Sequence, residues 1–217
     1  MTQVLSPEAI REHLLRHLIV PDFDEENHAY TYNRMPVPSV TGMLKDLGFI
    51  DATWFTEEAR DRGRMVHLAA QYLLEGDLVL PEEQDDLYGI RPRMAALQRF
   101  VDDYQAVPLL LEQPAVDPIW RYAGTWDALF WIPKGGYLLL PDFKSGRPLK
   151  ATRYQLALYA RLVETGLALL KDRPQLRRAA LELKPNGLYS LTPYTDHRDP
   201  QKALAIATTY HCRMEMN

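Results

Sequence analysis

The stretch RYAGTWDALFWIPKGGYLLLPDFK, from Arg121 to Lys144, decides the fold that we expect for this chain. Aromatic and branched residues dominate both sides of the segment Pro133–Gly136, and such residues favour β-strands. Proline and glycine are typical of turns, so the stretch predicts a hairpin in which Ile132 pairs with Tyr137.

Two carboxylates and a lysine come together in this hairpin. With the turn at Pro133–Gly136, Asp127 lies directly opposite Asp142, with Cβ atoms about 5 Å apart. Lys144 shares the face of Asp142 because it lies two residues further along the strand. A turn shifted to Gly135-Gly136 would place Asp127 opposite Lys144 instead, so both registers keep the three groups together.

The surroundings of the two acids are apolar. The residues expected on the same face are Leu129, Trp131, Leu138 and Leu140. Opposed like charges in a dry place are costly unless a cation compensates them, and oxygen-rich carboxylate pairs suit Mg²⁺ or Mn²⁺. A structural ion-pair cluster, in which Lys144 neutralises one acid and an arginine the other, explains the geometry equally well. Glu112, on the neighbouring predicted strand, could support the site if it uses the same face.

The rest of the chain alternates between helical and extended patterns. Helices are expected over about 7–18, 53–75, 92–104, 153–166 and 200–211, with a short one begun by Ser39 or Thr41. Further strands are expected over 28–32, 35–40, 109–112, 180–184 and 188–194, the last two joined across Asn186-Gly187. The predicted fold class is α/β (α+β), with a small mixed sheet flanked by helices.

Composition narrows the class of protein. The 217 residues are 47% hydrophobic and 25% charged, as expected for one soluble globular domain. No apolar run approaches the roughly 18 residues of a membrane span, and the first residues do not resemble a secretion signal. The single cysteine, Cys212, excludes a disulfide framework within one chain. We therefore expect a cytoplasmic protein.

Positive charge is concentrated in two places, although the net charge is −4. The segment from Phe143 to Val163 contains no acidic residue but five basic ones: Lys144, Arg147, Lys150, Arg153 and Arg161. Residues 60–64 contain three arginines, Arg64 among them. Such clusters fit a local phosphate track, and a solvated surface is the alternative.

An ordered series of motifs resembles a known family. Gly124–Asp127, Pro141–Lys144, and Gln155 with Tyr159 are similar to the G-x-x-D, D-x-K and Q-x-x-x-Y series of RecB-like PD-(D/E)XK nucleases. That group includes the RecB nuclease domain, CRISPR adaptation nucleases, the mitochondrial genome-maintenance exonuclease and small phage nucleases. Similar stretches extend the resemblance: Tyr30–Tyr32, Pro38–Thr41 and Arg62–His67.

The resemblance implies a restriction-endonuclease-like core and a set of metal ligands. His67, Asp127, Asp142 and the carbonyl of Phe143 would hold Mg²⁺ or Mn²⁺. Without the family, a histidine between Val66 and Leu68 is more often a partly buried structural residue.

The resemblance also assigns catalytic and supporting roles. Asp127, Asp142 and Lys144 would be catalytic, and Gln155 and Tyr159 would orient Lys144, a water or a substrate phosphate. The basic group that includes Arg64 would guide the strand. If the substrate is single-stranded, bases could stack on aromatic residues such as Tyr154, Trp54 or Tyr72.

The implied activity is that of a metal-dependent deoxyribonuclease, of the exonuclease type, working in DNA processing or recombination. Residues 1–217 would form one nuclease domain, with supporting helical and hairpin elements over 1–50 and, given one cysteine, no iron–sulfur cluster. Its partners would be single- or double-stranded DNA ends and a recombination or single-strand-binding protein, in the cytoplasm of a bacterial host if phage-encoded. The alternative is a non-catalytic nucleic-acid-binding or recombination partner protein on a nuclease fold.

Overall fold

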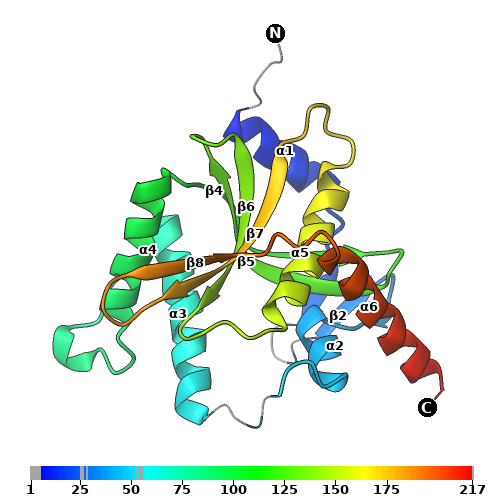
Figure 1. Cartoon of the computed structure of the whole chain (residues 1–217), viewed down its shortest axis with the longest axis horizontal. Helices are drawn as coiled ribbons and strands as arrows, with labels where there is room; N and C mark the ends of the chain where they lie inside the picture. Colours follow the sequence, from blue (N-terminus) through cyan, green and yellow to red (C-terminus); the bar gives the residue numbers. More distant parts are fainter. Residues whose placement is uncertain (1–5, 25–26, 28, 52, 54–55, 217) are drawn as a thin grey trace.

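A five-stranded mixed sheet, in the order β4-β5-β6-β7-β8, forms the centre of the computed structural model (Figure 1). The structure describes residues 6–24, 27, 29–51, 53 and 56–216. The strands are β4 (Val107–Asp117), β5 (Tyr122–Ile132), β6 (Tyr137–Lys144), β7 (Gln175–Leu183) and β8 (Tyr189–Pro193). Neighbouring strands are antiparallel except β6 and β7, which are parallel because α5 (Thr152–Leu167) connects them. The predicted α+β class with a mixed sheet is confirmed.

The hairpin of β5 and β6 has the first of the two registers considered. Ile132 pairs with Tyr137, and regular pairing of the two strands extends to Phe130 with Leu139. Beyond that point the backbone nitrogen of Phe143 donates a hydrogen bond to the Asp127 side chain, with a donor–acceptor distance of 2.5 Å. The Asp127 side chain therefore accepts a hydrogen bond that a backbone carbonyl would accept in a regular strand pair.

Helices cover both faces of the sheet. One face packs against α1 (Pro7–His17), α2 (Val40–Asp46), α5 and α6 (Asp199–Glu215), and the other against α3 (Glu57–Glu75) and α4 (Ile90–Tyr104) (Figure 1). Their starts follow ordinary capping rules: Ser6, Ser39 and Thr56 each accept a hydrogen bond from the backbone three residues on. No described helix is long and apolar enough to cross a membrane.

Several boundaries differ from the sequence-based expectation. A strand that was not predicted, β1 (Asp22–Asp24), joins β2 (Ala29–Tyr32) and β3 (Met35–Val37) in a second sheet of three strands. Strand β4 is longer than expected, and α6 continues four residues past His211. A short 3-10 helix, η1 (Glu83–Asp85), precedes α4. His28 and Trp54 lie outside the described residues.

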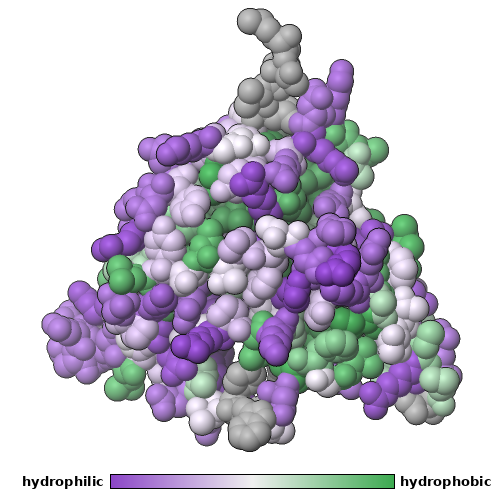
Figure 2. Space-filling model, in the orientation of Figure 1, coloured by the Kyte–Doolittle hydropathy of each residue, from purple (hydrophilic) through white to green (hydrophobic). Residues whose placement is uncertain are grey.

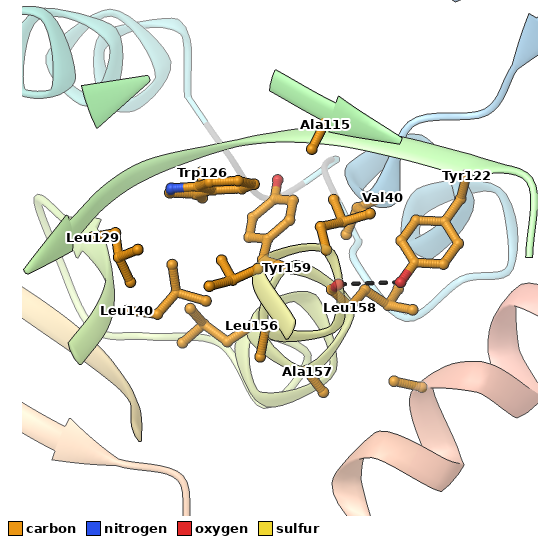
Figure 3. Packing of buried hydrophobic residues seen from close by; sticks show 14 of the residues in the cluster. Val40, Ala115, Tyr122, Trp126, Leu129, Leu140, Leu156, Ala157, Leu158 and Tyr159 are labelled. Carbon is orange, nitrogen blue, oxygen red and sulfur yellow. Dashed lines mark hydrogen bonds between the residues drawn. The ribbon is translucent and has the colours of Figure 1, made fainter. Parts of the chain in front are cut away.

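Tyr159 of α5 is the centre of the packing between the sheet and its helical cover. In Figure 3 its ring points from α5 toward β5 and lies between Trp126 and Val40. Only 6% of Tyr159 is exposed, and a Cβ atom built on Gly124 would lie 2.5 Å from its ring. Beside it, the Tyr122 hydroxyl donates to the carbonyl of Leu158 over 3.1 Å. The glycine and the tyrosine of the motif series are therefore packing partners.

Replacing Gly124 with alanine should destabilise the protein by about 1–3 kcal/mol, because the new methyl group overpacks the core. Urea unfolding monitored by circular dichroism measures the effect. Gly146→Ala is the matched control, since a Cβ there meets nothing within 4 Å. Equal stability of the two variants would contradict this description of the Gly124–Tyr159 contact.

Candidate active site

Three side chains from three elements converge at the middle of the β4–β5 pair. They are His67 of α3, Glu112 of β4 and Asp127 of β5, and one potential ligand atom of each lies within 4.8 Å of the others. Nδ1 of His67 is 3.2 Å from Oδ1 of Asp127. An imidazole nitrogen with two carboxylates is a donor set that divalent cations accept, so these residues fit a metal centre.

Glu112 reaches this cluster through an irregular strand. Pairing of Leu111 with Ala128 places the next residue, Glu112, opposite Asp127, after a register shift earlier in β4. Glu112 has a φ of 41°, a left-handed conformation that costs a non-glycine residue about 1–2 kcal/mol. Strained residues of this kind occur preferentially at functional sites.

Asp142 and Lys144 lie on the adjacent strand β6. Asp142 is 3% exposed, and its Oδ2 is 2.5 Å from Nζ of Lys144. This contact is a close ion pair, in which the Lys144 ammonium compensates the buried carboxylate.

Burial and the neighbouring charges shift the pKa values of the cluster. Burial alone lowers the pKa of His67, but the Asp127 carboxylate more than offsets this and raises it to about 9. Burial raises the pKa of Glu112, and repulsion from Asp127 raises it further, to about 8. Burial also opposes ionisation of Asp127, yet its pKa is lowered because the charge of His67 attracts the carboxylate. Without a cation, His67 and Glu112 therefore carry protons at neutral pH.

In the β6 pair the pKa values of both the acid and the base are raised. Burial raises the pKa of Asp142 even though Lys144 works against the shift. Burial lowers the pKa of Lys144, but Asp142 and Asp127 more than offset this and raise it. Lys144 is therefore a permanent cation facing two carboxylates.

The structure brings Gln155 and Tyr159 to the same region but as part of its wall. Burial raises the pKa of the Tyr159 phenol, and its polar neighbours Gln155 and Thr41 oppose this shift. Tyr159 and Glu112 line a common cavity of about 430 Å³ between the sheet and α2. Their roles toward a substrate stay predictions.

The other expected site residues are placed less directly. The ring of Phe143 lies 6.3 Å from the His67 ring, and its backbone nitrogen contacts Asp127, so its carbonyl as a metal ligand stays a prediction. The Arg64 side chain is 77% exposed and paired with Asp61 of the same helix. The sequence did not decide whether Glu112 belongs to the site, because the register of β4 determines which face of the sheet its side chain occupies.

Comparisons with known proteins give a limited result. No protein-family model matches the chain. No curated protein matches it either. Among solved structures, it is similar to the crystal structure of a proposed exonuclease from Eubacterium rectale, with 14% identity and a TM-score of 0.49 over 97% of this chain and 83% of that one. A likeness of this extent carries no argument about activity.

Binding of Mg²⁺ should strengthen as the pH rises from about 7 to about 9, because the cation must displace protons from Glu112 and His67. Calorimetric titrations in two buffers of different ionisation enthalpy measure both the affinity and the protons released. Glu112→Gln should bind more weakly and release fewer protons. An affinity independent of pH would contradict a site made of these ligands.

Proposed function

We propose that this protein is a metal-dependent nuclease that hydrolyses phosphodiester bonds in DNA. The observation that carries the proposal is the convergence of His67, Glu112 and Asp127 beside the buried Asp142–Lys144 pair. A nuclease needs a cation to offset phosphate charge and a fixed group near the attacked phosphorus, and this arrangement supplies candidates for both.

The sequence motifs support the same assignment. The aspartates and the lysine of the PD-(D/E)XK-like series lie on the two adjacent strands β5 and β6, and its glutamine and tyrosine lie on α5 next to them. We extend the proposal to the domain organisation: residues 1–217 form one nuclease domain with a restriction-endonuclease-like core, supported by the elements within residues 1–50.

The metal would be held by His67, Glu112 and Asp127, with Asp142 and the carbonyl of Phe143 as further ligands. Bound there, Mg²⁺ or Mn²⁺ would lower the pKa of a water molecule and offset charge on the phosphate. Glu112 is added to the ligands implied by the family resemblance because it faces Asp127 directly.

The chain's own residues orient the reaction. Lys144 keeps its positive charge between the two aspartates and can donate a hydrogen bond to the attacking water or to a phosphate oxygen. The backbone nitrogen of Phe143 fixes one oxygen of Asp127, which leaves Oδ1 directed at His67. Tyr159, Gln155 and Thr41 form a polar wall that would limit how a substrate can approach.

Finer assignments rest on the family resemblance alone. We propose exonuclease action on single- or double-stranded ends, in DNA processing or recombination such as that of a phage, inside the cytoplasm of a bacterial host. A recombination or single-strand-binding protein is the proposed partner. A non-catalytic DNA-binding or recombination-partner role on the same fold is the competing function.

Degradation of end-labelled single- and double-stranded DNA with Mg²⁺, Mn²⁺ or EDTA tests the proposal. We expect cleavage only with a cation, and a loss of roughly 100-fold or more in Lys144→Ala, as for other groups that stabilise transition-state charge. Asp127→Asn should abolish cleavage. The control is Lys134→Ala, at the turn end of the same hairpin, which should cleave normally.

Two results would count against the proposal. One is cleavage that continues in EDTA, and the other is full activity in Asp127→Asn. Metal binding without cleavage of any DNA would favour the binding-protein alternative.

A further inference from the structure

An aromatic groove lies beside the candidate active site. A cavity of about 500 Å³ is lined by Phe49, Tyr154 and Tyr194, together with the loop that follows Lys144 and the start of α5. Phe49 is 45% exposed, and its ring meets that of Tyr154 edge-on, with the ring centres 5.9 Å apart. We call these three residues and their cavity the aromatic groove. Figure 2 shows hydrophobic surface between α2 and α6, bordered by strongly hydrophilic side chains.

The sheet sets the distance from this groove to the carboxylates. Asp142 pairs with Ala180, and Ala180 pairs with Thr192, which lines the groove. Two strand spacings are about 10 Å, and paired residues share a face of the sheet. The charges of the site act on Tyr194. Burial raises its pKa, the Asp142 carboxylate raises it further, and the Lys144 charge lowers it. The groove therefore lies beside the site, about two strand spacings from Asp142.

The charge along the groove is positive. Asp196 and Asp199 are both neutralised, because four basic residues pair with them: Arg153, Arg178, Arg198 and Lys202. Arg147 and Lys150 are exposed in the loop between Lys144 and α5, and neither forms an ion pair within the described part of the chain.

A side chain of β7 joins two parts of the groove. Arg178 donates hydrogen bonds to the carbonyls of Arg153 and Tyr194, and so ties the start of α5 to the end of β8. The backbone beside Tyr154 is thereby connected to the backbone of Tyr194.

We propose that the aromatic groove binds single-stranded DNA, with unpaired bases stacked on Phe49 and Tyr154 and with phosphates contacted by Lys150 and Arg147. The proposal rests on the proposed nuclease function and specifies its substrate as an unpaired strand. Aromatic faces and free cations in one groove are the features of sequence-tolerant single-strand binding, and paired bases cannot present their faces to the rings.

Fluorescence anisotropy with a short labelled oligonucleotide in EDTA tests the groove apart from cleavage. The wild-type protein should bind the single strand more tightly than the duplex. Tyr154→Leu, which keeps apolar volume but removes the ring, should weaken single-strand binding by roughly 5- to 100-fold, and Tyr154→Phe should not. Leu169→Ala is the control, since Leu169 is exposed and lies about 22 Å from Tyr154 along α5 and its continuation.

Salt dependence tests the cationic part. Lys150→Ala should reduce the slope of log affinity against log salt by about 0.7, the effect of one lost phosphate contact on a single strand. Lys171→Ala, an exposed lysine beyond the other end of α5, should leave the slope unchanged.

The outcomes separate this inference from the nuclease proposal. Unchanged single-strand binding in Tyr154→Leu, equal weakening toward duplex, or a preference for duplex would overturn the groove assignment, even if metal-dependent cleavage holds. Single-strand binding that depends on Tyr154 in a protein that cleaves nothing would support the groove and refute the nuclease.

Discussion

The side chain of Asp127 is only 11% exposed, and a charge in such a place must be compensated by its surroundings. Here the compensation comes from three directions: the His67 ring of α3, the backbone nitrogen of Phe143 on β6, and the charge of Lys144. Each of these requires its own element to sit at a fixed distance from β5. The geometry of the candidate site and the packing of α3 against the sheet are therefore parts of one constraint.

Glu112 can ionise beside Asp127 at neutral pH only if a further positive charge joins the cluster. It adds a second acid opposite Asp127, in a strained backbone conformation, and its pKa is raised by burial and, in addition, by repulsion from Asp127. A fold selected only for stability has no reason to place two acids in this way, since an apolar pair would pack at lower cost. The strain and the repulsion are what a divalent cation would relieve.

Much of the architecture could be predicted from local patterns. The β5–β6 hairpin could be predicted because the proline and glycines of its turn leave few alternatives for the register. In the structure, Ile132 does pair with Tyr137. Helix caps such as Ser39 could be predicted because the side-chain oxygen accepts a hydrogen bond from a backbone N–H only three residues away. Strand β1 was not predicted, because its three residues carry a pattern too short to distinguish from a loop.

The candidate site was predictable only where its residues share one hairpin. Asp127, Asp142 and Lys144 came from the register of two adjacent strands. Glu112 did not, because a bulge in β4 decides its face, and bulges leave no reliable trace in the residue pattern. Of the aromatic groove, the sequence suggested only Tyr154: Phe49 and Tyr194 are far apart in sequence, and only tertiary packing brings them beside it.

The close packing of Gly124 against Tyr159 divides the motif series into two kinds of signal. These two residues are in tight contact between β5 and α5. Any chain with this packing needs a small residue at the position that the tyrosine ring contacts. They would persist in a homologue that had lost all chemistry, whereas the aspartates and the lysine would not. A search for related sequences should therefore use the glycine and the tyrosine to recognise the scaffold, and the acids and the lysine to separate working enzymes from inert descendants.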